Sequence, residues 1–163
     1  AIKKIGEIGW KPDMFFLAAT STSVSSVLKP AGFEHSKGII SSYSLKDPND
    51  PQWKDDPDVI ALKTFMKDYF PDGNLQDQLI VYGYVVAEAT VQVLKQCGDD
   101  LTHENIMKQA ASLQDFRTEV LLPGIKINTA ANDFAPISQL QLMKFKGDKW
   151  ELFGEVISAD VGG

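Results

Sequence analysis

The stretch MFFLAATSTS, at residues 14–23, decides how the fold is predicted. Six apolar residues, at 14–19, stand in a row, and four hydroxyl residues follow them. A short continuous apolar run is typical of a strand that is buried on both faces in a parallel sheet. The hydroxyl residues can cap a helix, which we expect to begin near Val24 and to end before Pro30. A buried strand followed at once by a helix predicts an α/β protein.

The other elements are predicted from turn residues and from the spacing of apolar residues. They are helices at 1–9, 57–70, 79–95 and 102–113, a loop at 31–37, strands at 38–43, 118–122 and 125–127, and a hairpin at 140–157. The helix at 79–95 has so broad an apolar surface that we expect burial on most of its sides. Residues 47–53 hold two prolines and several turn formers, so we expect them to cross between two parts of the molecule.

Composition argues against several classes of function. The chain has 163 residues, of which 44% are hydrophobic and 23% charged, as in one ordinary globular domain. A net charge of -6 argues against a nucleic-acid partner, because that binding rests on clustered Lys and Arg. No apolar run approaches the roughly 20 residues that span a bilayer. The single Cys97 offers no internal disulfide and no zinc set, and we expect it to pack late in a helix.

The sequence has no pattern that predicts catalysis. Thr and Ser residues follow the first strand, where a phosphate-binding loop would carry glycines, and no Gly-x-Ser-x-Gly motif occurs. His35 and His103 have no partners at ligand spacing, so we predict surface positions for them and no metal. Glu119 and Glu151 stand among apolar residues of predicted strands and are expected to face solvent. We therefore predict neither an enzyme nor a cofactor.

One cluster of polar residues suggests a binding site. Thr20, Ser21 and Thr22 follow the first strand, and open parallel sheets bind ligands outside the carboxyl ends of their strands. Their hydroxyls, with the N–H groups of a helix start, can hold a carboxylate without Lys or Arg. Tyr43 ends the second strand and is expected at the same edge. The simpler alternative is that the three hydroxyls only cap the helix.

Gln78 and Tyr82 open the long helix after a polar loop. A single amide and an amphipathic aromatic ring at the end of an element suit a cleft for one small ligand. Both therefore join the predicted ligand-binding residues. For Tyr82, and for Tyr84 beside it, packing in the core is an equal alternative.

Several segments, in order along the chain, resemble the Leu/Ile/Val-type binding proteins of ABC importers. They are residues 1–12 (AIKKIGEIGWKP), Ala31-Gly32 with residues 38–40, residues 46–53 (KDPNDPQW), Tyr84 with Ala87, residues 121–126 (LLPGIK) and the closing hairpin. The resemblance covers essentially the whole chain. It implies an α/β, type I periplasmic-binding-protein-like fold, with two lobes of three αβα layers that close on a solute. It also implies that only the C-terminal portion of that fold is present.

By this resemblance the chain divides into three parts. Residues 1–45 would be part of the second ligand-binding lobe, residues 46–135 part of the helix-rich first lobe, and residues 136–163 a hairpin that crosses the hinge. A portion cut in this way exposes strand edges and apolar helix faces. We therefore expect it to need its missing N-terminal portion, or a second copy of the chain, in order to fold.

The resemblance further implies the solute-binding component of an ABC importer, located in a bacterial periplasm after removal of its signal peptide. Its partners would be a small organic ligand and a membrane permease. The family's amino acid binders carry an acidic residue where Thr20 stands here, and residues 21–31 hold no Asp or Glu. A buried ammonium group without a counter-charge is costly. We therefore predict an aromatic or other carboxylate in preference to an amino acid, opposed from the first lobe by residues 78–80.

Two other interpretations stay open at this stage. A ligand-sensing domain of a receptor or regulator with the same fold would use closure to signal to another protein, and gene context would distinguish it. An enzyme of a flavodoxin-like or other α/β class would need a nucleophile, a phosphate loop or an acid–base pair, and we find none in the sequence.

Overall fold

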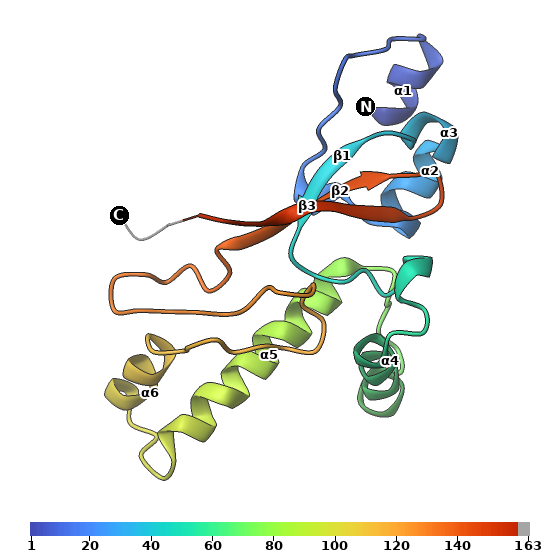
Figure 1. Ribbon diagram of the computed structural model, residues 1–163. Helices are drawn as coiled ribbons and strands as arrows, with labels where there is room; N and C mark the ends of the chain where they lie inside the picture. Colours follow the sequence, from blue (N-terminus) through green and yellow to red (C-terminus); the bar gives the residue numbers. More distant parts are fainter. Residues whose placement is uncertain (160–163) are drawn as a thin grey trace.

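The computed structural model of the chain describes residues 1–159 and has a mixed α/β architecture (Figure 1). Its elements, in chain order, are α1 (Ile2–Glu7), η1 (Ala19–Ser21), η2 (Val24–Leu28), α2 (Lys29–Ala31), α3 (Phe33–Ser36), β1 (Ile40–Tyr43), η3 (Pro51–Trp53), α4 (Pro57–Tyr69), α5 (Gln78–Cys97), α6 (His103–Ala110), β2 (Gln139–Phe145) and β3 (Trp150–Ser158). Residues 44–53, here called the crossing segment, lead from β1 toward α4.

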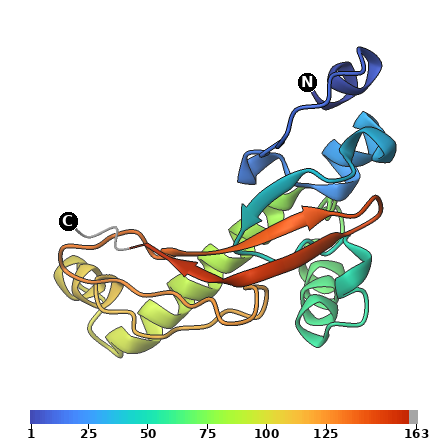
Figure 2. The same cartoon turned by 45° about the horizontal axis from the view of Figure 1, so that its top comes forward.

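Three antiparallel strands form the sheet, in the order β1-β2-β3. Phe145 lies opposite Trp150 where the β2–β3 hairpin turns. A bulge between Leu140 and Leu142 shifts the register of this hairpin further along. The hairpin predicted near the end of the chain is therefore confirmed, and Figure 2 shows its two strands beside β1.

The predicted first strand pairs in parallel with β1, but only through the bridge of Phe16 with Ile40. The Leu17 N–H donates to the Ile40 carbonyl at 2.8 Å, and the Ile40 N–H donates to the Phe15 carbonyl at 2.9 Å. The prediction of burial on both faces is wrong, because Met14 and Phe16 are 66% and 51% exposed. Among residues 1–159, β1 alone pairs with this run, which leaves its other edge open.

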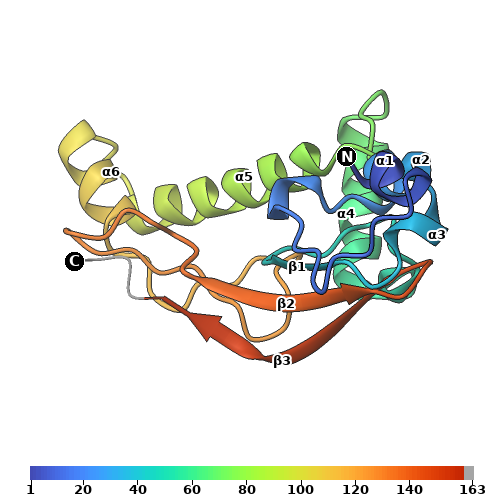
Figure 3. The ribbon, with the colours of Figure 1, turned by 90° about the horizontal axis from the view of Figure 1, so that it is seen from above.

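Two apolar cores hold the elements together. The first, here called the sheet core, has the buried members Ile2, Val24, Leu28, Ile39, Met143, Phe145 and Trp150. The second, here called the helix core, joins α4 and α5 to residues 113–127 and includes Leu62, Val81, Val85, Leu121 and Ile125. Tyr43 and Leu152 pack against both cores. Figure 3 shows α5 on one side of the hairpin, with α4 near one end of α5 and α6 at the other.

The helix ends follow local signals in the sequence. Asp56 caps α4, because its Oδ1 accepts the N–H groups of Asp58 and Val59, both at 3.1 Å. Thr102 caps α6 in the same manner. Gly98 follows α5 with a φ of 59°, a conformation that glycine adopts without strain. The predicted starts of the helices at 57 and 102 are therefore confirmed, and α5 continues to Cys97, two residues beyond its predicted end.

Two predictions around Pro30 are wrong. The helical run that Ser23 caps continues through Pro30 to Ala31, because Pro30 stands in the first turn of α2, where a missing N–H costs little. Residues 31–37, predicted as a loop, contain the one-turn helix α3. Gly32 separates the two helices with a φ of 93°, a conformation that favours glycine.

The region after α5 differs from the prediction as well. The strands predicted at 118–122 and 125–127 are wrong, because these residues contribute only isolated bridges, such as Leu45 with Leu121. Their burial against the helix core explains the apolar pattern. The helix α6 ends at Ala110, before the predicted Leu113.

The long helix α5 is less buried than predicted. Val81 and Val85 are buried, but Val86 is 47% and Leu94 is 42% exposed. The elements described in residues 1–159 therefore cover α5 on part of its circumference only. No helix in this part of the chain is long and apolar enough to cross a membrane.

Candidate functional site

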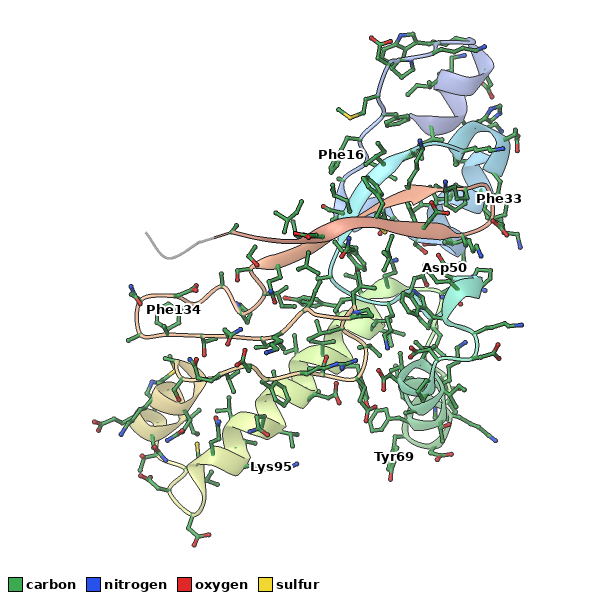
Figure 4. The ribbon with its side chains drawn as sticks, viewed as in Figure 1. Phe16, Phe33, Asp50, Tyr69, Lys95 and Phe134 are labelled. Atoms are coloured by element: carbon green, nitrogen blue, oxygen red, sulfur yellow. The ribbon has the colours of Figure 1, made fainter. Side chains whose placement is uncertain are left out.

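Two buried carboxylates tie the crossing segment to three other elements. Asp47 Oδ2 accepts the Val24 N–H at 3.2 Å and the Gln78 Nε2 amide at 3.4 Å. Asp50 Oδ2 accepts the Trp150 N–H at 2.8 Å. The starts of η2, α5 and β3 therefore meet at this point, here called the hub. Figure 4 labels Asp50 between the sheet and α4.

Lys46 fixes the same segment to α4. Its side chain is 2% exposed, and its Nζ lies 2.8 Å from Asp56 Oδ1 and 2.7 Å from Asp58 Oδ2. The Nζ also lies 5.5 Å from the centroid of the Trp53 ring, a cation–π distance. Burial alone would raise the pKa of Asp56, but the hydrogen bond from Lys46 and the N–H groups of the helix start outweigh it and lower that pKa.

Three of the six predicted ligand-binding residues meet at the hub. Thr22, Tyr43 and Gln78 line a cavity of about 10 Å³, together with the two buried carboxylates. This volume is enough for one water molecule at most and is too small for an organic solute. Burial, and after it the charge of Asp47, raises the pKa of Tyr43 to about 12, so its hydroxyl stays protonated and can donate.

The other three predicted residues do not line this cavity. Thr20 is exposed and Ser21 half-buried, both in η1, and Tyr82 is 55% exposed on α5. The Thr22 hydroxyl donates at 2.8 Å to the carbonyl three residues before it, so it closes the turn η1. The cap of the next helical run is Ser23. The simpler interpretation, that all three hydroxyls only cap a helix, is therefore wrong for Thr22.

Asp47, Asp50 and Trp150 are the hub residues that the sequence did not predict. The two acids stand in a run of turn formers, where a carboxylate is usually an exposed turn residue. Their burial depends on Val24 and Trp150, which lie 23 and 100 residues away along the chain. The predicted crossing at residues 47–53 was the one feature of the sequence that pointed to Asp47 and Asp50. A segment that passes between two parts of a molecule is held by polar side chains that bind to both parts.

A larger hollow lies between α4 and α5 and is here called the α4–α5 groove. Its volume is about 630 Å³, within the range of small-molecule sites, and it is open to solvent. Phe65, Tyr84 and Val91 give it apolar walls, and Glu88 and Lys95 are among its charged residues. None of the six predicted ligand-binding residues lines this groove.

Three titratable residues that the sequence analysis considered, Cys97, Glu119 and Glu151, do not gather into a site. Cys97 lies late in α5, as predicted, and it is buried there, although only half-burial was expected. Glu119 and Glu151 are exposed, as predicted, although Glu119 also accepts the Tyr84 hydroxyl at 3.4 Å. Within residues 1–159, no group of three or more His, Cys, Asp or Glu side chains is placed to hold a metal ion.

Comparison with known proteins identifies the family of the chain. Residues 1–149 match the family model described as periplasmic binding protein. The chain belongs to this family, whose members are solute-binding proteins and whose location is extracytoplasmic. No curated protein sequence matches the chain significantly.

Solved structures with low sequence identity share the fold. A branched-chain amino acid ABC transporter protein from Thermus thermophilus, solved with bound valine, has a TM-score of 0.78 at 15% identity over 98% of this chain and 42% of its own. A possible leucine/isoleucine/valine-binding protein from Rhodopirellula baltica has a TM-score of 0.66 at 16% identity over 94% of this chain and 38% of its own. A leucine-binding protein from Thermotoga maritima has a TM-score of 0.61 at 12% identity over 98% of this chain and 41% of its own.

The chain therefore spans about two fifths of the length of these proteins. The predicted type I periplasmic-binding-protein fold is confirmed, and this share is consistent with a C-terminal portion of it. The resemblance to binding proteins of the branched-chain amino acid type is confirmed as well.

Proposed function

We propose that the chain is part of the solute-binding component of an ABC importer, which captures a small organic solute between two lobes. The observation that carries this proposal is the hub. There one carboxylate, Asp47, binds Val24 from the sheet core and Gln78 at the start of α5. A short segment held to both sides by a few side chains can act as a hinge while each apolar core keeps its packing.

In this proposal residues 1–45 belong to one lobe, residues 46–135 to the other, and the hairpin at 136–163 crosses the hinge. Residues 160–163 of that hairpin lie outside the described part of the chain. The separation into two apolar cores supports this division. The hairpin supports it too, because Phe145 and Trp150 lie in the sheet core, whereas Ile137 and Val156 pack against the helix core.

We place the solute at η1 rather than in the small cavity of the hub. Thr20 is exposed and Ser21 half-buried, so their hydroxyls can reach a carboxylate, and the exposed ring of Tyr82 offers an amphipathic surface. Thr22, Tyr43 and Gln78 would support this surface from the hub. An α-ammonium group would lack a free counter-charge here, because N–H donors already occupy the carboxylates of the hub.

The proposed partners are the solute and the membrane permease of a bacterial importer, with a periplasmic location. Family membership supports them, as does the transporter named for the Thermus thermophilus structure. The open edge of the first strand and the exposed side of α5 support the need for further polypeptide or a second copy.

Thermal unfolding of the purified chain with benzoate, phenylacetate, leucine or valine tests this function. A higher melting temperature with an aromatic acid, and none with leucine or valine, is the expected result. Stabilisation by leucine or valine instead would agree with the family assignment and would overturn the preference for an aromatic or other carboxylate over an amino acid. If the melting temperature responds to no solute, the placement of the solute site at Thr20, Ser21 and Tyr82 is contradicted.

Two variants connect that result to η1. Thr20→Val and Ser21→Ala should each remove the stabilisation by the aromatic acid and leave the melting temperature of the free chain unchanged, because neither side chain is buried. Thr90→Val, which changes an exposed hydroxyl on α5, is the matched control and should keep the response. Loss of the response in all three variants would contradict a site at η1.

A further inference from the structure

Asp50 is a buried carboxylate that joins the crossing segment to β3. Its residue is 1% exposed. Its Oδ2 accepts the backbone N–H of Trp150 at 2.8 Å and the Gln52 side-chain amide at 3.1 Å, and its Oδ1 accepts the Gln52 backbone N–H at 3.0 Å. The burial and the donors of Asp50 therefore come from this chain and need no further polypeptide.

The small cavity of the hub places a second carboxylate near Asp50 and no cation. Asp47 is 6% exposed and lines the same cavity. Tyr43, from β1, is the one other titratable group among the lining residues, and its pKa of about 12 keeps it neutral. The residues that η1, α5, β2 and β3 contribute to the cavity are all uncharged: Thr22, Gln78, Met143, Trp150 and Leu152.

The charged residues that flank the hub in sequence have other surroundings. Lys46 is buried in the crossing segment, but its Nζ binds the two carboxylates at the start of α4. Asp77 at the start of α5, and Lys149 and Glu151 in the hairpin, are exposed. Within residues 1–159, no cationic side chain lines the cavity or pairs with Asp50, so its negative charge is offset by N–H donors alone.

This environment favours the neutral form of Asp50. Burial is the largest effect on the pKa of Asp50 and raises it. The N–H groups of Trp150 and Gln52 lower this pKa without cancelling the effect of burial, and the charge of Asp47 raises it further. The folded chain thus keeps a proton that an unfolded Asp, with a pKa of about 3.9, has lost. Stability from this group is present in acid and is lost as the pH rises through the raised folded value.

We propose that the hub is a pH-sensitive contact, in which Asp50 takes up a proton from solvent in mild acid and the release of this proton at higher pH weakens the contact of the crossing segment with β3. The weakening extends to η1, because the indole N–H of Trp150 donates to the Thr22 carbonyl at 2.9 Å. This proposal concerns contacts within the chain and does not depend on the solute. Its consequence for lobe closure, by contrast, rests on the function proposed above, in which the crossing segment is part of the hinge.

An NMR titration of the purified chain, labelled with ¹⁵N at tryptophan only, tests the proton uptake. The chain has three tryptophans, and comparison with Trp150→Phe assigns the signals of Trp150. We expect its backbone N–H signal to shift with a midpoint above about pH 3.9, because its acceptor changes between a carboxylate and a carboxylic acid. Asp50→Asn should abolish this shift. A midpoint at or below about pH 3.9, or a shift that persists in Asp50→Asn, overturns the proposal.

Hydrogen exchange of the Trp150 indole N–H in the same samples tests the weakening of the contact. Its protection, corrected for the intrinsic exchange rate at each pH, should fall about threefold or more between about pH 4 and about pH 7, and should stay constant in Asp50→Asn. Glu151→Gln, at an exposed carboxylate of β3, and Glu88→Gln, which removes a titrating group beside the helix core, are the controls and should keep the fall. A wild-type protection that ignores pH, or a fall that only Glu88→Gln removes, overturns the proposal.

A second variant keeps the assignment to Asp50 testable if Asp50→Asn does not fold, which far-UV circular dichroism detects. Gln52 is half-buried, and Gln52→Met removes the amide donor at 3.1 Å from the Asp50 carboxylate. The midpoint of the Trp150 signal should then rise, because the charged form loses a hydrogen bond. Gln76→Met, at an exposed amide, is the matched control and should leave the midpoint unchanged. A midpoint that Gln52→Met does not raise would show that the signal follows another group, and would overturn the proposal.

Discussion

The indole N–H of Trp150 donates to the backbone carbonyl of Thr22 at 2.9 Å, although 128 residues separate the two in sequence. Trp150 is 3% exposed, and its ring packs edge to face against Phe145 with centroids 5.3 Å apart. The backbone N–H of Trp150 binds Asp50 in addition. The hairpin therefore holds both η1 and the crossing segment through one residue.

Trp150→Phe removes the indole N–H and keeps much of the ring packing. The Thr22 carbonyl then stays buried without this donor, so we expect the free energy of unfolding to fall by about 2–3 kcal/mol. Urea unfolding followed by far-UV circular dichroism measures the change. Trp10→Phe is the control, because Trp10 is 59% exposed, and it should change stability by less than about 0.5 kcal/mol. Equal losses in the two variants would contradict a specific role for the Trp150 bond.

Lys46→Met should destabilise the chain by about 2 kcal/mol, because it leaves Asp56 at the start of α4 without a cation and leaves Asp58 with only Arg117, at 3.7 Å. Those carboxylates, Asp56 and Asp58, are 19% and 29% exposed, so partial hydration limits the loss. Lys54→Met, at a side chain that is 73% exposed in its pair with Asp55, should cost less than about 0.5 kcal/mol. Urea unfolding of both variants gives the comparison, and a Lys54 effect as large as that of Lys46 would contradict the expectation.

The same ion pair predicts a response to acid. The pKa of Asp56 is lowered in the folded chain, so its contribution to stability is present above the usual Asp pKa of about 3.9 and is lost as the pH falls through the lower folded value. The stability difference between wild type and Lys46→Met should therefore shrink below about pH 4. Unfolding curves of both proteins at a series of pH values measure it. If the stability difference between the two proteins stays constant down to the lowest pH, the ion pair of Lys46 with Asp56 is not its cause.

Local signals predicted much of the fold because their causes lie within a few residues. Asp56 followed by Pro57 starts α4, and Gly98 ends α5, in each case through contacts within one helical turn. The hairpin was predictable for the same reason, since its alternating strands flank a short polar turn. Pro30 misled the prediction because its effect depends on its position within the helix, and the sequence did not show where α2 begins.

The candidate site depends on contacts that no local pattern contains. Thr22, Tyr43 and Gln78 were predicted from their places at element ends, and the structure brings them together. The carboxylates between them were missed, because Asp47 becomes a buried acceptor only when η2 and α5 meet it. The exposure of Val86 was missed for a related reason, since a broad apolar surface does not tell which parts of it a neighbour covers.

Tyr82→Ala and Val85→Ala should separate binding from stability on one helix. Val85 is 3% exposed, and the loss of its methyl groups should cost about 1–2 kcal/mol of unfolding free energy. Tyr82 is 55% exposed, so its truncation should leave stability within about 0.5 kcal/mol and weaken binding of an aromatic acid. Urea unfolding and calorimetric titration with benzoate measure the two effects. A Tyr82→Ala chain that unfolds, with unchanged affinity per folded molecule, would show that the ring belongs to the core.

Glu88→Gln should stabilise the chain in a pH-dependent manner. The pKa of Glu88 is raised to about 7 by burial and then by Glu119, so the folded chain keeps a proton that the unfolded chain has lost between about pH 4.5 and 7. Wild-type stability therefore falls as the pH rises through this window, and the neutral amide removes the fall. Because solvent screens a half-buried carboxyl, we expect a gain of about 1 kcal/mol at about pH 8 and none at about pH 4.5. Thermal unfolding at the two pH values measures it, with Glu104→Gln as the exposed control. A gain of equal size at both pH values would instead point to a change in helix propensity or packing.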